Sequence, residues 1–296
     1  MLPAKRFTFP WYTWLGLAIL VGAESMLAGG VRLVAVWFTP IVWTGYILLA
    51  DGIVSRLRGA SWLTSRRREF PLLVLTSVAV WLLFEAYNLH LKNWVYVGVP
   101  SSPLLRDLAY FWAFATIMPG VFESAALVEA LLPRRSKLAT DPPVDGRLGP
   151  GWLWFLAGVA MVTIPLLLPE RTAAYLFAPV WMGFIFVLEP INERLAAPSL
   201  RARWRAGDRR PVRALLIGGL LCGFLWEAWN YQAFLTDGGH WIYTIPQALR
   251  PFGLHYGKMP VLGLGGFPPF ALELYAFYAF ARQMLGGDRI FGALSS

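Results

Sequence analysis

The sequence is poor in cysteine and in charged residues. Its single cysteine, Cys222, excludes an intramolecular disulfide framework and a multi-cysteine metal site. Only 15% of the 296 residues are charged, whereas a soluble domain carries about a quarter. Hydrophobic residues make up 57% and aromatic residues 16%. This composition excludes a disordered chain, a fibrous repeat and an ordinary cytosolic enzyme, and it predicts an all-α, polytopic membrane protein.

The sequence also lacks the short motifs that announce common catalytic chemistry. It has no P-loop, no dinucleotide-binding glycine fingerprint after a strand and no Gly-x-Ser-x-Gly elbow. We therefore expect no nucleotide-driven transport within this chain, no cofactor and no metal. A metal site built from His90, His240 and His255 with Glu227 is an alternative, although the spacing of these residues along the sequence matches no metal-binding motif.

Long hydrophobic runs recur along the sequence. A helix needs about 20 apolar residues to cross the hydrocarbon core of a bilayer. Runs of this kind occupy residues 9–28, 31–50, 71–89, 108–133, 151–169, 173–190, 214–232 and 259–285. We therefore expect about eight transmembrane helices.

The positive charges are distributed unevenly between these runs. Eight crossings place both termini on the same side as the segments 51–70, 134–150 and 191–213, and this side holds 20 of the 26 Lys and Arg residues. By the positive-inside rule, both termini are expected to be cytoplasmic, in an inner or plasma membrane. The net charge of +9 is then explained by the excess of Lys and Arg on the cytoplasmic side, and we expect no nucleic-acid partner.

The second half of the sequence repeats the first. The matching pairs are Trp14 with Trp154, Phe38-Thr39-Pro40 with Phe177-Ala178-Pro179, Trp43-Thr44-Gly45-Tyr46 with Trp181-Met182-Gly183-Phe184, Asp51 with Glu189, Glu85-Ala86-Tyr87-Asn88 with Glu227-Ala228-Trp229-Asn230, Trp94-Val95-Tyr96 with Trp241-Ile242-Tyr243, and Pro119 and Glu123 with Pro269 and Glu273. An even number of spans per half predicts two parallel four-helix repeats, residues 1–135 and 151–296, joined by a cytoplasmic linker, 136–150. The first span is then equivalent to the fifth, so we expect it to be retained rather than removed as a signal peptide.

Four glutamates of the hydrophobic runs form two repeat-related pairs. They are Glu85 with Glu227 and Glu123 with Glu273. Ionisable groups inside hydrocarbon are costly, so each of them is a candidate catalytic residue. The run Gly263–Pro269 is too rich in glycine and proline for a regular helix, and we expect irregular backbone there, lining a cavity.

These acids and the neighbouring aromatic residues predict a cavity in the outer half of the bilayer. An apolar site can keep a carboxylic acid protonated as a Brønsted acid, and aromatic faces stabilise cations. The candidate substrate-binding residues are Asn88, Asn230, Trp94, Tyr96, Trp226, Trp229, Trp241 and Tyr243. The structural alternatives are that Glu and Asn merely join helices, and that Trp and Tyr form an interfacial belt.

Three segments of the second half carry a further signal: Trp226-Glu227-Ala228-Trp229-Asn230-Tyr231, Trp241-Ile242-Tyr243 and Pro269-Phe270-Ala271-Leu272-Glu273 with Phe277. Together with their counterparts in the first half, they resemble the small integral-membrane lycopene cyclases and the related membrane terpene cyclases. That family is also built from duplicated units, and the resemblance implies that the acids protonate an isoprenoid double bond. The chain has one carboxyl group after Pro269, where the family usually has two.

The leading hypothesis is an isoprenoid- or carotenoid-modifying enzyme, similar to a cyclase or isomerase, that acts without a cofactor. Glu227 and Glu273 would form the acid–base pair, with Glu85 and Glu123 in secondary roles. The expected partners are the lipid bilayer and a lipophilic isoprenoid-like substrate, whereas the sequence leaves the oligomeric state open. The alternatives are a transporter or channel with duplicated halves, and a non-catalytic membrane assembly partner.

Overall fold

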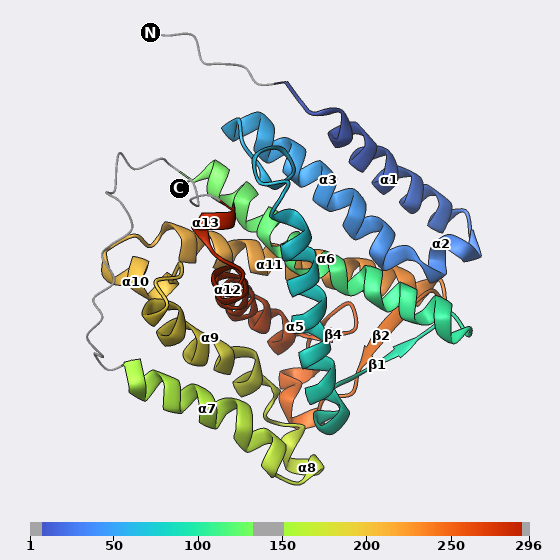
Figure 1. Cartoon of the computed structure of the whole chain (residues 1–296). Coiled ribbons are helices and arrows are strands. Elements are labelled where there is room, and N and C mark those ends of the chain that lie inside the picture. The colour runs from blue at the N-terminus through green and yellow to red at the C-terminus, as the bar shows by residue number, and fades with distance from the viewer. Residues whose placement is uncertain (1–7, 133–150, 292–296) are drawn as a thin grey trace.

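The computed structural model describes residues 8–132 and 151–291, which form a helical protein with two short strand pairs (Figure 1). Within these residues, eight helices have 17 residues or more, and each overlaps one of the predicted spans. They are α1 (Trp11–Ala28), α3 (Phe38–Arg58), α5 (Phe70–Leu91), α6 (Pro103–Leu131), α7 (Gly151–Leu167), α9 (Phe177–Arg194), α11 (Arg210–Leu235) and α12 (Val261–Met284). The predicted linker, 136–150, lies outside the described residues.

Short elements connect the long helices. The short helices are α2 (Arg32–Val36), α4 (Trp62–Ser65), α8 (Glu170–Ala173), α10 (Leu200–Arg205) and α13 (Asp288–Phe291), with 3-10 turns at Gln247–Leu249 and Pro251–Gly253. The strands are β1 (Trp94–Val97), β2 (His240–Tyr243), β3 (His255–Tyr256) and β4 (Met259–Pro260). Strand β1 pairs antiparallel with β2, and β3 with β4.

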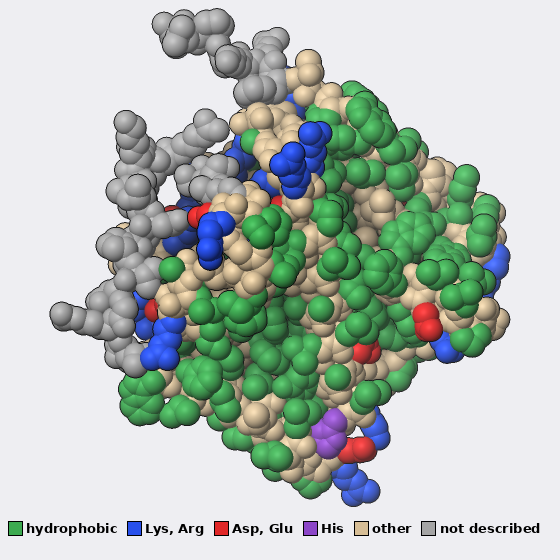
Figure 2. Space-filling view, in the orientation of Figure 1, with side chains coloured by type: hydrophobic (Ala, Val, Ile, Leu, Met, Phe, Trp, Pro, Cys, Tyr) green, Lys and Arg blue, Asp and Glu red, His purple; other side chains and the backbone are tan. Residues whose placement is uncertain are grey.

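The apolar character of the helices is that of an integral membrane protein. In the described ranges, α1, α3, α5, α6 and α11 are long and apolar enough to cross a membrane, and α7 is a shorter apolar helix. Figure 2 shows apolar side chains over most of one face, with charged side chains mainly at its margins. The count of eight crossings, the cytoplasmic side of the termini and the kind of membrane stay predictions.

Two outer helix pairs flank a central group of helices. Helix α1 packs on α3 and α7 packs on α9, at opposite sides of α5, α6, α11 and α12 (Figure 1). Both outer pairs approach closely through glycine. A Cβ atom on Gly16 would lie 2.6 Å from the Gly45 carbonyl oxygen, and one on Gly158 would lie 2.8 Å from that of Gly183. A larger residue at either site would therefore push the paired helices apart.

An acidic residue near the end of α3 and another in α9 hold the short helix that follows. Asp51 accepts hydrogen bonds from the Ser61 hydroxyl at 2.7 Å and the Leu63 backbone N–H at 2.9 Å. Glu189 accepts them from the Ser199 hydroxyl at 2.7 Å and the Arg201 backbone N–H at 2.8 Å. In both cases the partners lie 10 and 12 residues after the acid.

The predicted irregular backbone at Gly263–Pro269 is wrong, because this run belongs to the continuous helix α12. Close packing explains why a run with poor helix propensity is helical. A Cβ atom on Gly266 would lie 2.7 Å from the Trp181 ring, and one on Gly263 would lie 2.7 Å from the Met259 side chain. Tertiary contacts of this kind override the weak local preference against helix.

Candidate functional site

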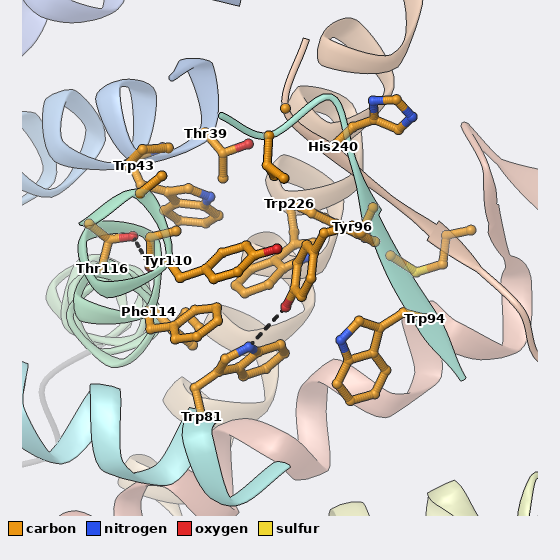
Figure 3. A pocket seen from close by; sticks show the side chains of 18 of the residues that line it. Thr39, Trp43, Trp81, Trp94, Tyr96, Tyr110, Phe114, Thr116, Trp226 and His240 are labelled. Carbon is orange, nitrogen blue, oxygen red and sulfur yellow. Dashed lines mark hydrogen bonds between the residues drawn. The ribbon is translucent and has the colours of Figure 1, made fainter. Parts of the chain in front are cut away.

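A cavity lined by aromatic rings lies between the central helices and the β1–β2 ribbon (Figure 3). It comprises about 1030 Å³ of space free of atoms, including its open mouth. Its aromatic wall consists of Trp43, Trp81, Trp94, Trp181, Trp226, Trp241, Tyr96, Tyr110, Tyr243, Phe114, Phe267 and Phe270. The Trp226 ring lies centrally in this wall, with its centroid 5.7 Å from that of Trp43, 5.7 Å from Trp81 and 5.4 Å from Trp241.

The two Trp-x-Tyr segments form the paired strands β1 and β2. Trp94 lies opposite Tyr243, and Tyr96 lies opposite Trp241. Side chains two residues apart on a strand share a face, and all four of these side chains line the cavity. Trp94 and Trp241 are only 7% and 8% exposed, which disfavours the interfacial-belt alternative for both.

Glu85 of α5 lies directly behind this wall. One of its carboxyl oxygens accepts hydrogen bonds from the Tyr96 hydroxyl at 2.5 Å and from the indole N–H groups of Trp81 at 2.9 Å and Trp94 at 3.0 Å. All three donors are cavity-lining residues. The carboxyl group therefore acts on the cavity through the side chains bound to it.

Glu227 of α11 has the equivalent position behind β2. One carboxyl oxygen accepts a hydrogen bond from the Tyr243 hydroxyl at 3.1 Å, and the other accepts the backbone N–H groups of Lys258 at 2.5 Å and Met259 at 3.1 Å. The turn before β4 passes so close that a Cβ atom on Gly257, where φ is +58°, would lie 2.6 Å from this carboxyl group. Glu227 therefore binds both a cavity tyrosine and the β3–β4 turn.

Asn88 and Asn230 hold the strands rather than the cavity. The Asn230 amide donates to the Trp241 carbonyl at 3.1 Å and accepts the Trp241 N–H at 2.9 Å. The Asn88 amide likewise donates to the Trp94 carbonyl at 2.9 Å and accepts the Trp94 N–H at 3.2 Å. Each side chain replaces a neighbouring strand, and neither lines the cavity.

The two strand tyrosines line the cavity, and each donates its hydroxyl proton to a glutamate behind the wall. Burial and the adjacent Glu85 carboxyl raise the pKa of Tyr96 well above its ordinary value. Burial and Glu227 raise the pKa of Tyr243 in the same way. Both phenols therefore keep their proton at neutral pH.

The four predicted glutamates have different surroundings: none of them lines the cavity, whereas Glu85 and Glu227 bind tyrosines that do. Glu123 is fully buried beside Asp51, away from the wall. Glu273 is also fully buried and accepts the Phe184 backbone N–H at 3.0 Å. Glu123 and Glu273 therefore meet neighbours other than the cavity residues.

Trp229 also lies outside the wall. Its indole N–H donates to Glu24 at 3.1 Å, and its ring packs against Trp43 with the centroids 5.0 Å apart. For the metal alternative, no cluster of three or more His, Cys, Asp or Glu occurs within residues 8–132 and 151–291. His240 lines the cavity, and its Nδ1 lies 2.9 Å from the Gly238 carbonyl oxygen.

Sequence reasoning missed half of the tryptophans in the wall. Trp43 of α3 and Trp181 of α9 occupy matched positions in the two halves of the sequence, and both line the cavity. Their recurrence at matched positions was the signal that could have identified them. Trp81 has no matching residue in the second half, so only its contact with Glu85 reveals it.

Comparisons of the chain with protein-family models, with curated proteins and with solved structures gave no match in any of the three. The class of protein therefore follows from the fold and the cavity alone. It is a helical membrane protein with an aromatic internal cavity and two glutamate-bound tyrosines in the cavity wall.

Proposed function

We propose that this chain is an integral-membrane enzyme that acts on a polyprenyl or carotenoid-like lipid by acid-initiated, cofactor-independent chemistry. The observation that carries the proposal is the aromatic cavity into which Tyr96 and Tyr243 project while bound to Glu85 and Glu227. The aromatic lining suits an extended apolar ligand. The resemblance to membrane lycopene and terpene cyclases supports the same chemistry.

The proposed architecture is two parallel four-helix repeats with eight crossings. Three features of the two halves support it: the acid-to-helix hydrogen bonds of equal spacing, the glycine contacts of the two outer helix pairs, and the two Glu–Tyr pairs on paired strands. The cavity would then lie between the repeats, because each half supplies one strand of the ribbon.

In the proposed reaction, a carboxylic acid acts through a tyrosine. In this step Glu227 is protonated and donates to the Tyr243 oxygen, the reverse of the hydrogen bond described above, which frees the Tyr243 hydroxyl proton. That proton moves to an alkene carbon of the lipid, while the proton of the Glu227 acid moves to the Tyr243 oxygen. A C–H bond forms and the alkene π bond breaks, which leaves a carbocation on the neighbouring carbon. Attack by a second double bond forms a ring and moves the positive charge to another carbon. With or without that attack, loss of an adjacent proton through Tyr96 to Glu85 restores a double bond, which completes a cyclisation or an isomerisation without oxidant or reductant.

The wall supplies what such a cation requires. Aromatic faces attract cations by about 2 kcal/mol or more when water is excluded, and six indole rings line this cavity. Glu85 replaces Glu273 as the second acid–base group in this proposal, because Glu273 does not reach the wall. The aromatic lining favours an enzyme over a transporter or channel, which would need polar groups along its path.

The test is expression of the chain in cells that accumulate linear isoprenoids, both hydrocarbon and oxygenated, followed by chromatography of extracted lipids. A new cyclised or isomerised product is expected. Because the acid and its tyrosine act together, Glu227→Gln and Tyr243→Phe should each lower its yield by about 100-fold or more. A chain that makes no new product would contradict the proposal.

Glu24→Gln is the matched control. Glu24 is also a glutamate in an apolar helix and also accepts an indole N–H, but its donor, Trp229, does not line the cavity. The control should retain product, whereas a purely structural role for buried glutamates would make all the variants fail alike. A non-catalytic assembly partner would instead tolerate Glu227→Gln without loss of the cellular phenotype.

A further inference from the structure

The cavity wall contains polar groups that no side chain or backbone group satisfies. Within the described part of the chain, the indole nitrogens of Trp43 and Trp181 and the hydroxyl of Thr39 are buried and have no hydrogen-bond partner. All three residues line the cavity. The Trp43 side chain is 2% exposed, so it gains nothing from solvent. Buried polar groups are rarely left unpaired, and each such case requires an explanation.

Three other indole N–H groups in the same wall do have hydrogen-bond partners. Trp81 and Trp94 donate to Glu85, and Trp241 donates to the Tyr243 hydroxyl. The N–H groups of these three tryptophans are therefore satisfied by the protein. Those of Trp43 and Trp181 come from helices α3 and α9, at repeat-related positions, and are directed to neither glutamate.

Thr39 and Trp43 form one polar position of the wall. They are four residues apart on α3 and so share a helix face. In Figure 3 the Thr39 hydroxyl and the Trp43 ring nitrogen both point away from α3 into the space before it. Trp181 forms the other position, and its helix carries Ala178 where the first half has Thr39. The first position therefore has two groups for a ligand atom, and the second has one.

The chemistry of these groups defines the ligand. An indole N–H only donates, whereas a threonine hydroxyl can donate or accept. A pure hydrocarbon would leave both indoles unpaired, and a quaternary ammonium ion would offer them no acceptor. Building on the proposed function, we propose that the cavity binds a neutral isoprenoid lipid with a carbonyl oxygen, of ketone type. This oxygen accepts from Trp43 and Thr39, and a lipid with a second carbonyl would present that oxygen to Trp181.

The experiment measures equilibrium binding of two labelled probes to the full chain in lipid nanodiscs. The probes are farnesylacetone, an isoprenoid ketone, and the hydrocarbon in which a methylene group replaces its carbonyl. The ketone should bind at least tenfold more tightly than the hydrocarbon. Trp43→Phe keeps an aromatic ring but removes the N–H, so it should abolish most of this preference while leaving hydrocarbon affinity unchanged.

Two further variants keep the test decisive. Thr39→Val should reduce ketone affinity severalfold, even if Trp43→Phe fails to fold. Trp112→Phe is the matched control, because the Trp112 indole donates to Thr44 at 2.9 Å and does not line the cavity; it should keep the full preference.

The outcomes separate this inference from the proposed function. Equal affinity for both probes, or a preference that survives both Trp43→Phe and Thr39→Val, overturns the carbonyl assignment and leaves the lipid enzyme standing. If neither probe binds, both proposals are overturned.

Discussion

Replacing Asn230 with alanine tests whether the amide holds strand β2. The side chain is fully buried and makes two hydrogen bonds with the backbone of Trp241. Alanine removes both of these hydrogen bonds, and also the one from the Asn230 amide to the Glu227 carboxyl at 3.3 Å, and it leaves the buried N–H and carbonyl of Trp241 unpaired. Each unsatisfied group costs about 1–3 kcal/mol, so Asn230→Ala should lower the free energy of unfolding by about 2–6 kcal/mol.

Asn192→Ala is the control for this substitution. Asn192 is also fully buried, but it makes a single hydrogen bond, from its amide to the Ala276 carbonyl at 3.0 Å. Its oxygen has no partner among the described residues. Asn192→Ala removes the same side-chain volume but leaves only one buried group, the Ala276 carbonyl, without its partner. It should therefore lower the free energy of unfolding by about 1–3 kcal/mol through that group. Reversible unfolding in mixed detergent micelles, followed by circular dichroism, measures both variants.

The comparison of the two asparagines can refute the reasoning. If the Asn230 amide replaces a missing strand, Asn230→Ala is more destabilising than Asn192→Ala by about the cost of one buried polar group. Equal destabilisation would mean that the loss of side-chain volume, and not the strand contact, sets the effect. The structural account of Asn88 and Asn230 would then fail as well.

Two further predictions concern helix packing and charge. A Cβ atom on Gly52 would clash with the Thr13 hydroxyl oxygen, so Gly52→Ala should destabilise the α1–α3 pair by about 1–3 kcal/mol and lower the thermal unfolding midpoint. Gly22→Ala is the control: a Cβ atom there would meet nothing within 4 Å, so the midpoint should stay unchanged or rise. The Lys92 ammonium lowers the pKa of the exposed Glu170 carboxyl, so Lys92→Met should return that pKa upward in a carboxyl-carbon NMR titration. Because the pKa of Glu170 is lower in the folded than in the unfolded chain, the ion pair stabilises the fold above the unfolded-state pKa, and this stability is lost as the pH falls through the folded-state pKa. Below about pH 4, the unaltered chain should therefore lose slightly more stability than Lys92→Met. An unchanged titration curve in the variant would rule out the ion pair as the cause.

The helical character of the chain was predictable because hydrophobic runs of membrane length are the strongest signal in this sequence. The boundaries of the helices were less predictable. The predicted span 31–50 is in fact a short helix, α2, followed by α3, which begins at Phe38 and continues to Arg58. Pro40 fits the first turn of a helix, and Asp51 stays inside because it binds the start of α4. A hydropathy window detects neither effect.

The strands could not be predicted as strands. Each has four residues, too few to show a reliable alternation, and β1 pairs with a segment that is distant in sequence. The residues of both segments were nevertheless identified as site candidates, because Trp94, Tyr96, Trp241 and Tyr243 recur in matched motifs. Their partners across space came only from the structure.

The candidate acids show the same division. Repetition and the cost of buried charge singled out Glu85 and Glu227, which the structure joins to cavity tyrosines. The same reasoning selected Glu123 and Glu273, which meet other neighbours. Sequence spacing shows which helix carries an acid, but not which layer of side chains separates it from an internal space.

The β1–β2 ribbon acts as a mechanical tie across the molecule. It joins the chain after α5 to the chain after α11 by backbone hydrogen bonds, and each strand is anchored by an asparagine to the helix before it. If these two segments separated to open the cavity, the backbone hydrogen bonds between β1 and β2 would break. For the lipid proposed above, entry between helices from the bilayer would leave these backbone hydrogen bonds intact.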